Sequence, residues 1–193
     1  EQPYNDLPLL LPDHNIWETM EIYKKLAEAR AALAELKGRL PVIPNPLMLI
    51  NTLVLQEAKD SSTIENIFTT NDELYKAFSS SGSNINSSTK EVLRYREALW
   101  SAFAKLKSPT DYSVYLAVEI FKTITNKDEG IRTVQVYIGS SNSVVYTPPE
   151  HGNILTEKLN NWFDAALNNN SIDPLIKMAM LHYQFEAIHP FTD

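Results

Sequence analysis

Apolar residues recur at helical spacing along most of this 193-residue chain, and residues 131–146 alone show the alternation that is typical of a strand pair. Five glycines are few for this length, which argues against an all-β fold with glycine in its turns. Because an isolated two-stranded hairpin is marginally stable, we expect the alternating stretch to lie against helices or to serve a function. The sequence therefore predicts a mainly α fold with one β-hairpin.

Capping and breaker residues divide the helical pattern into segments. The first predicted helix covers residues 15–37, because a capping-box pattern starts at Asn15 and Gly38 supplies a stop. Asn45 and Thr89 are the predicted caps of two later helices. Helices therefore dominate both halves of the chain. The remaining ones are predicted at residues 46–59, 62–66, 72–78, 90–103, 111–125, 155–167 and 174–188.

Residues 79–88 read SSSGSNINSS, a stretch with almost nothing to bury and several side chains that compete for backbone hydrogen bonds. We predict a flexible connector there and a domain boundary after residue 88. This prediction gives an N-terminal helical extension at residues 1–88 and a second domain at residues 89–193.

Charge and composition exclude several classes of protein. Seventeen basic against twenty-four acidic residues leave a formal net charge of −7, the wrong sign for holding a phosphate backbone, so we expect no nucleic-acid partner. The longest apolar runs are far shorter than the roughly 20 residues of a membrane helix, so we expect no membrane partner and a cytoplasmic protein. The absence of cysteine excludes disulfides, zinc ribbons and thiol nucleophiles, and is compatible with either redox compartment.

Three side chains of the last predicted helix have the spacing of a metal site. His182, Glu186 and His189 stand at i, i+4 and i+7, and Glu186 to His189 match the Glu-x-x-His element of di-iron bundles. We find no second such pair, so a core histidine and a solvated glutamate are the favoured interpretation of His182 and Glu186. His189 differs because Pro190 follows it, which places the imidazole where a helix gives way to a loop.

Residues 62–65, Ser-Thr-Ile-Glu, form a capping-box pattern in which Ser62 would cap a helix and Glu65 would reach back to its amide. From the residues alone, this structural interpretation is favoured over a functional one. The hairpin pattern is likewise more often structural, although an unpaired strand edge can capture an extended peptide.

Residues 181–193, LHYQFEAIHPFTD, resemble the signature of the Fic family of nucleotidyl transferases, which runs His-Pro-Phe-x-Asp/Glu-Gly-Asn-Gly/Lys-Arg. The resemblance continues upstream through RTVQVYIG at 132–139, YTPP at 146–149 and the helix at 159–167. Residues 61–66, SSTIEN, are similar to the Ser/Thr-x-x-x-Glu-Gly/Asn inhibitory motif of a helical extension that often precedes this domain. The resemblance implies a Fic-like helical bundle with one β-hairpin flap, preceded by that extension.

The same resemblance implies an autoinhibited protein adenylyltransferase, which moves AMP from ATP to a Ser, Thr or Tyr hydroxyl of a target protein. His189 is the implied catalytic base. Asp193 is implied to hold Mg²⁺ together with phosphate oxygens. Phe191 is expected to be a packed anchor for the loop between them.

In this family the flap lies over the nucleotide and its edge pairs with the target segment. The nucleotide-covering role falls here on Ile138, Gly139, Ser140 and Ser141. Glu65 is the implied inhibitory carboxylate, which reaches the nucleotide site and blocks the productive pose of the γ-phosphate, and Ser61 would help to hold it. A capping role for Glu65 predicts only lower stability for Glu65→Gly, whereas an inhibitory role predicts more transfer.

Other functions stay open at this point. The same fold could use another phosphate-containing donor or remove AMP from the target, and without its phosphate-binding loop it would be a non-catalytic peptide-binding module. Because the sequence stops at Asp193, inside the family signature, we expect the natural chain to continue beyond it. The expected partners are ATP and a protein target bound along the flap hairpin, and a homo-oligomer is a further open alternative.

Overall fold

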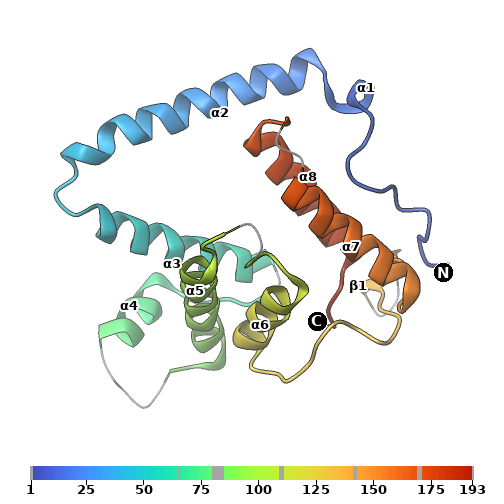
Figure 1. Cartoon of the computed structure of the whole chain (residues 1–193). Coiled ribbons are helices and arrows are strands. Elements are labelled where there is room, and N and C mark those ends of the chain that lie inside the picture. The colour runs from blue at the N-terminus through green and yellow to red at the C-terminus, as the bar shows by residue number, and fades with distance from the viewer. Residues whose placement is uncertain are drawn as a thin grey trace. The chain divides into compact units, whose positions relative to one another are not determined.

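A computed structural model of the chain describes residues 2–64, 66–79, 85–108, 111–140, 143–168 and 171–192. By their contacts the residues fall into two compact units (Figure 1): residues 1–37 with 130–193, here called the flap unit, and residues 38–129, here called the helical unit. Across the described ranges, helices make up most of both units and a two-stranded sheet lies in the flap unit. None of the described helices is both long and apolar enough to cross a bilayer. The predicted mainly α fold with one hairpin is confirmed, while the boundary after residue 88 stays a prediction.

The flap unit is built on two helices that pack against each other, α7 (Asn153–Asn168) and α8 (Pro174–Ile188). α8 begins after Asp173, whose Oδ1 accepts a hydrogen bond from the Leu175 amide at 2.9 Å, and it ends before Pro190. Both helices confirm the prediction from the apolar spacing. The core between them and the N-terminal segment consists of Leu7, Leu155, Leu159 and Ile188.

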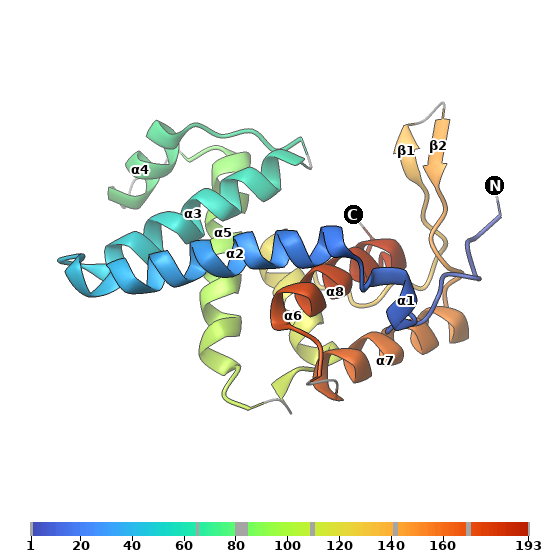
Figure 2. The ribbon, with the colours of Figure 1, turned by 90° about the horizontal axis from the view of Figure 1, so that it is seen from above.

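The N-terminal segment is part of the flap unit, because side chains of both helices bind its backbone. Asn161 of α7 accepts from the Leu10 amide at 2.7 Å and donates to the Leu10 carbonyl at 2.6 Å. Gln184 of α8 donates to the Pro8 carbonyl at 2.7 Å. Figure 2 shows this segment running past α7 toward the hairpin. Residues 8–10 thus connect α7 to α8 through hydrogen bonds, in addition to the loop that joins the two helices in sequence.

The helix predicted at residues 15–37 is interrupted. α1 (His14–Trp17) is one turn long, and α2 (Met20–Arg39) begins after Thr19, whose Oγ1 accepts a hydrogen bond from the Ile22 amide at 3.3 Å. The capping box predicted at Asn15 is wrong, because Asn15 lies inside α1. A threonine four residues later supplies the side-chain oxygen that starts the longer helix.

The stop predicted at Gly38 is also wrong. Gly38 lies within α2, which continues to Arg39 and is followed by the 3₁₀ turn η1 (Leu40–Val42). A glycine ends a helix when it adopts the left-handed conformation, and Gly38 is not among the residues with positive φ. Pro41, inside η1, is the residue at which the α-helical pattern changes.

The helical unit contains α3 (Pro46–Ile64), α4 (Asn71–Ser79), α5 (Ser87–Lys105) and α6 (Val114–Thr125). α5 contacts each of the other three. The core of the helical unit contains side chains from three helices. They are Leu55 and Ala58 of α3, Leu74 of α4 and Val92 of α5. This unit therefore has a hydrophobic core of its own.

The end of α3 and the starts of α5 and α6 differ from the prediction. Asn45 caps α3 as predicted, because its Oδ1 accepts from the Met48 amide at 3.1 Å. However, α3 does not end near Lys59, and one continuous helix replaces the two predicted at 46–59 and 62–66. Asp60 and Ser61, which suggested a break, are accommodated inside the helix with their side chains bonded to the preceding turn.

The cap predicted at Thr89 is wrong. Asn86 caps α5, because its Oδ1 accepts from the Thr89 amide at 2.7 Å. Thr89 is buried in the first turn, and its hydroxyl lies 2.7 Å from the Thr69 hydroxyl. A threonine can therefore serve as a core hydrogen-bonding residue where the sequence pattern suggests a cap. Of the connector predicted at 79–88, residues 80–84 lie outside the described residues.

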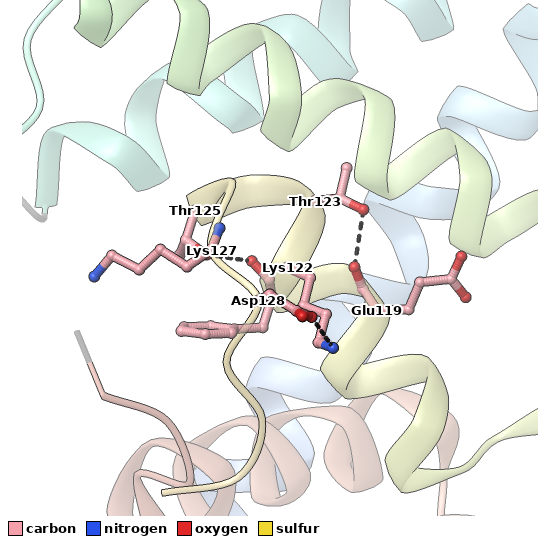
Figure 3. A network of polar contacts seen from close by, with 7 residues as sticks. Glu119, Lys122, Thr123, Thr125, Lys127 and Asp128 are labelled. Carbon is pink, nitrogen blue, oxygen red and sulfur yellow. Dashed lines mark hydrogen bonds and ion pairs between the residues drawn. The ribbon is translucent and has the colours of Figure 1, made fainter.

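Polar contacts order the chain where α6 ends and the helical unit leads toward residue 130 (Figure 3). Thr123 donates to the Glu119 carbonyl, the Lys127 amide donates to Thr125, and Lys122 pairs with Asp128. Between these residues the chain leaves the helix through a left-handed asparagine at position 126. The exit from α6 is thus fixed by bonds within ten residues of sequence.

The hairpin is shorter than predicted. β1 (Ile138–Ser140) pairs antiparallel with β2 (Ser143–Tyr146), and residues 138–146 are called the flap below. The strand predicted to start near Val134 is wrong for residues 134–137. Side chains there bind backbone carbonyls that a strand ladder would use, as Gln135 does when its amide donates to the Pro148 carbonyl at 2.9 Å.

Candidate active site

His189 lies at the C-terminal end of α8, where the helix gives way to a loop as predicted. Its φ of 46° and ψ of 69° place it in the left-handed region, which is uncommon for residues other than glycine. Its amide donates to the Phe185 carbonyl at 3.0 Å, its side chain is half-buried, and the next residue, Pro190, is buried. The conformation turns the chain sharply out of the helix at the residue that is predicted to be the catalytic base.

Phe191 is the packed anchor that the sequence predicts. It is 9% exposed, and its ring centroid lies 6.3 Å from that of Phe185 on α8. Phe185 in turn lies against Trp162 of α7, with ring centroids 5.2 Å apart. Aromatic packing thus fixes the loop after α8 to the helix pair.

Arg132 joins this loop to both ends of the hairpin segment. The residue is 3% exposed, and the hydrogen bonds described for its guanidinium all go to backbone carbonyls. Nε donates to His189 at 2.8 Å and Nη1 to Val134 at 3.1 Å, while Nη2 donates to Pro149 and, at 3.5 Å, to Ile188. Burial lowers the pKa of Arg132, but the ordinary pKa of a guanidinium is so high that the group stays charged.

Tyr146, the last residue of β2, ties the flap to α8. Its hydroxyl donates to the Ala187 carbonyl at 2.8 Å, one residue before the end of the helix. Burial raises the pKa of Tyr146 to about 12, and the neighbouring Tyr183 and Tyr4 act in the same direction. The phenol therefore stays protonated at neutral pH and keeps donating this hydrogen bond.

Three of the four predicted flap residues, Ile138, Gly139 and Ser140, form β1 and are exposed, while Ser141 lies outside the described residues. Between Ile138 and Gly139 the strand register shifts, so the flap contains a β-bulge. Gly139 has a φ of 146°, and a Cβ at this position would lie 2.2 Å from the Ser143 carbonyl oxygen. The flap in this register thus requires glycine at position 139.

The capping-box interpretation of residues 62–65 is wrong, because Ser62 lies buried inside α3 near its C-terminal end rather than at a helix start. The Ile67 amide donates to the Ser62 carbonyl at 2.9 Å and the Asn66 amide to the Thr63 carbonyl at 3.1 Å. This pair of bonds is a Schellman motif, and its left-handed residue is Asn66, with a φ of 61°.

Position 66 therefore favours glycine or asparagine, because these residues adopt the left-handed conformation most readily. They are also the two residues that the last position of the inhibitory motif takes. Ser61, at the first motif position, donates from Oγ to Glu57 Oε1 at 3.1 Å. Glu65 lies outside the described residues, so its contact with Ser61 stays a prediction.

The metal site considered on α8 is not supported by the described residues. His182 and Glu186 are both exposed, so the core interpretation of His182 is wrong and the solvated interpretation of Glu186 is confirmed. No group of three or more histidines and carboxylates in the described part of the chain could hold a metal ion. Asp193, the predicted Mg²⁺ ligand, lies outside that part.

A groove of about 610 Å³ also lies in the flap unit, between α2 and α8. Apolar side chains such as Trp17, Leu26 and Met180 line most of it, and the predicted site residues do not. The candidate active site is therefore the corner formed by His189, the loop after it and the base of the flap.

Sequence reasoning missed the contacts that build this corner. Arg132 appears in the sequence only as the first residue of a family-like stretch, and its partners are backbone carbonyls up to 57 residues away. The one available signal was a charged residue at the start of an alternating stretch that a Pro148-Pro149 pair closes.

Two family models match the chain in sequence order. Residues 23–104 match the Fic/DOC family N-terminal model, and residues 108–193 match the Fic/DOC family model. The end of α3, with residues 61–66, falls in the first match. Arg132, the flap and His189 fall in the second. The chain therefore belongs to the Fic/DOC family and is a Fic-domain protein with the family's N-terminal domain ahead of its Fic domain.

Proposed function

We propose that this Fic-domain protein is a protein adenylyltransferase, which moves AMP from ATP to a Ser, Thr or Tyr hydroxyl of a target protein. Members of the family are typically transferases, and protein modification such as AMPylation is the activity that a Fic domain suggests. The observation that carries the proposal is the geometry of His189, a histidine held in a left-handed turn at the end of α8 and joined to the flap through Arg132.

The reaction is an in-line displacement at phosphorus. The target oxygen forms a bond to the α-phosphorus of ATP, the bond from that phosphorus to the oxygen bridging it to the β-phosphate breaks, and pyrophosphate leaves. His189 takes the hydroxyl proton as the oxygen attacks. Neutral imidazole suits this role because its ordinary pKa of about 6.5 lies close to neutral pH.

The donor set proposed for the metal suits a hard cation. Mg²⁺ takes oxygen ligands and usually binds one or two carboxylates together with substrate phosphates. Asp193 is the proposed carboxylate, and the phosphate oxygens of ATP are the proposed further ligands. The chemistry that Mg²⁺ supplies in such a site is neutralisation of the charge on the departing pyrophosphate.

The flap has two proposed roles. Ile138, Gly139, Ser140 and Ser141 cover the nucleotide. An extended target segment adds to the exposed strand edge, whose main-chain groups position it without reading its sequence. The attachment of the flap to α8 through Tyr146 supports this assignment, because a target held by the flap is then held relative to α8 as well.

Inhibition is proposed to come from Glu65, which keeps the γ-phosphate out of its productive pose, with Ser61 as its support. The end of α3 supports the match to the inhibitory motif. Asn66 has the left-handed backbone that explains why glycine or asparagine follows the motif glutamate. The structural alternative, an N-terminal cap at residues 62–65, is removed because residues 62–64 lie at the C-terminal end of α3 and not at a helix start.

Labelling with ATP that carries ³²P at the α-phosphate tests this proposal in the full natural chain with Mg²⁺. We expect little label on wild-type protein, more on Glu65→Gly, and none on Glu65→Gly/His189→Ala. Equal labelling of wild type and Glu65→Gly would contradict the inhibitory role. The absence of label from all three proteins, with ATP binding retained, would contradict transfer to the protein itself and favour another donor or a binding module.

A further inference from the structure

The guanidinium of Arg132 contacts both the loop carrying His189 and the two ends of the flap segment. Val134 precedes β1 and Pro149 follows β2, so the contacts to their carbonyls close the base of the flap. The contact from Nε to the His189 carbonyl, and the bond from the Arg132 amide to the Pro190 carbonyl at 2.9 Å, hold the loop. One buried group therefore holds the flap at a fixed distance from the loop that carries His189.

The charge of Arg132 suits this position. The last carbonyls of a helix have no partners within the helix and form the negative end of its dipole. Nη2 and Nε bind two carbonyls at the end of α8, those of Ile188 and His189. No carboxylate is among the hydrogen-bond partners described for this guanidinium, so its charge is offset by oriented backbone dipoles.

The backbone of His189 needs such support. A histidine with a φ of 46° pays a conformational cost, and residues in sparsely populated regions persist where their surroundings over-determine them. Three contacts do so here: Arg132 binds the His189 carbonyl, the Phe185 carbonyl accepts from the His189 amide, and Phe191 packs on Phe185. This backbone geometry fixes the direction of the Cα–Cβ bond from which the imidazole extends.

We propose that Arg132 is a positioning residue for AMP transfer, which fixes the His189 imidazole relative to the flap and hence to the hydroxyl of a flap-bound target. The proposal rests on the function proposed above. It predicts that a small change at Arg132 slows the chemical step and leaves ATP binding intact, because a misplacement of about 1 Å at a reacting group can cost roughly 100-fold in rate.

Arg132→Lys is the variant that separates position from charge. Lysine keeps the positive charge but has one ammonium in place of a rigid fork, so it cannot serve carbonyls on both sides at once. Asn161→Ala is the matched control for lost stability, because Asn161 also joins two segments of the flap unit, and both of its described hydrogen bonds go to the Leu10 backbone and not to the loop after α8.

The experiment measures three quantities in the full natural chain carrying Glu65→Gly: the thermal unfolding temperature, the rate of self-labelling against ATP concentration, and the NMR signal of the His189 Cε1 proton, assigned by its loss in His189→Asn. We expect both variants to unfold at a lower temperature. With Arg132→Lys, the maximal labelling rate falls by about 10-fold to 100-fold, half-saturating ATP is unchanged, and the His189 signal shifts or broadens. With Asn161→Ala, labelling and the His189 signal stay as in the parent.

A lower unfolding temperature for Arg132→Lys with an unchanged labelling rate and an unchanged His189 signal would overturn the proposal. If the Glu65→Gly parent transfers no label, the proposed function fails, and the His189 signal alone then decides whether Arg132 positions the histidine. An effect on half-saturating ATP without an effect on the maximal rate would also count against the proposal, since it would place Arg132 in nucleotide binding.

Discussion

The C-terminal end of α8 carries the signature with His189, and the C-terminal end of α3 carries the predicted inhibitory motif at residues 61–66. The two helix ends differ in the contacts that hold them. Each helix ends next to a left-handed residue that is not glycine, His189 after α8 and Asn66 after α3. The bonds described at the end of α3 are local and join residues within the stretch 59–67 to one another. The end of α8 has local bonds as well, but it is also bound by Arg132, 57 residues away in sequence.

Burial follows the same division. Ile188, the last residue of α8, is fully buried, whereas Ile64, the last residue of α3, is 79% exposed. A helix end with local bonds and exposed side chains opens at low free energy, and one fixed by tertiary contacts opens close to the free energy of global unfolding. This difference suits the proposed roles, because a catalytic base works best when held in place and an inhibitory segment must be able to leave.

The largest expected effect comes from removing the imidazole while keeping the backbone. In a Glu65→Gly parent, His189→Asn should lower transfer by about 10²-fold to 10⁴-fold, the usual contribution of general base catalysis. Its unfolding temperature should stay close to that of the parent, because asparagine tolerates the left-handed conformation.

His189→Ala should lose the same activity and in addition about 1 kcal/mol of stability, because alanine is strained at this φ. Labelling with ATP and thermal unfolding measure the two effects. The matched control is His182→Ala, an exposed histidine on the same helix, which should change neither quantity. Retained transfer in His189→Asn would remove the base from the account.

The next effect concerns the flap. Gly139→Ala should disrupt the hairpin, because the new Cβ would lie 2.2 Å from the Ser143 carbonyl oxygen and 2.9 Å from the Val145 amide nitrogen. We expect faster hydrogen exchange in residues 138–146 and at least a roughly tenfold loss of transfer, since the target and nucleotide lose their support.

Gly152→Ala is the control for this prediction. Gly152 also has a positive φ, of 86°, but nothing lies within 4 Å of a Cβ there. It should cost only the strain of a left-handed alanine, about 1 kcal/mol, and leave the exchange of the flap unchanged. Equal effects of the two substitutions would show that the clash at Gly139 is relieved without loss of the hairpin.

The end of α3 should respond in the opposite direction. Asn66→Val should weaken the Schellman motif by roughly 1–2 kcal/mol, because a β-branched residue is disfavoured at this φ. If the local helix end holds the inhibitory segment, this variant should raise transfer in an otherwise wild-type chain, though less than Glu65→Gly does. Asn66→Gly should leave both stability and transfer close to wild type. A fall in transfer with Asn66→Val would contradict the assigned inhibition.

The smallest expected effect is the pH-dependent stability that a carboxylate at a helix start contributes. Each unit has such a carboxylate. Hydrogen bonding lowers the pKa of Asp173 at the start of α8, mainly through the Leu175 amide, and of Glu73 at the start of α4, mainly through the Thr70 amide. A carboxyl with a lowered pKa in the folded state contributes stability at a pH above its unfolded pKa, and this contribution is lost as the pH falls through the folded pKa.

Asp173→Asn keeps a capping oxygen and removes the charge, so it isolates this contribution. The variant should be less stable than wild type at neutral pH, and the difference in the free energy of unfolding should disappear in acid. Denaturant unfolding between pH 7 and acid measures it, with the exposed Glu157→Gln on α7 as the control. A difference that is independent of pH would contradict the charge effect.

Helix ends that are set by residues adjacent in the sequence were predictable from the sequence. The start of α3 at Asn45 and both ends of α8, at Pro174 and before Pro190, follow from capping and breaker residues alone. The continuation of α3 past Lys59 was not predictable, because it depends on the burial of Ser62. That burial comes from packing within the helical unit and leaves no local sequence signal. The strand predicted near Val134 failed for a similar reason, since Arg132 binds its carbonyl.

The candidate site shows the same limit. The position of His189 follows from a local signature, and the loop that carries it lies where the sequence places it. The role of Arg132 does not follow, because its partners are backbone carbonyls and carry no residue identity that a sequence pattern could reveal. Glu65, Ser141 and Asp193 lie outside the described residues, and their roles stay predictions from the resemblance.

The central claim is that His189 acts as the base in AMP transfer from ATP to protein. Its most direct test follows the α-phosphate and the γ-phosphate of ATP under the same reaction conditions. The full natural chain with Glu65→Gly is incubated with Mg²⁺ and ATP labelled with ³²P at either the α-phosphate or the γ-phosphate, beside the same protein with His189→Asn added. The account predicts that α-label joins the protein, that an equal amount of γ-label is released as pyrophosphate, and that both stop with His189→Asn. Label from the γ-phosphate on the protein, or α-label that persists without His189, would contradict it.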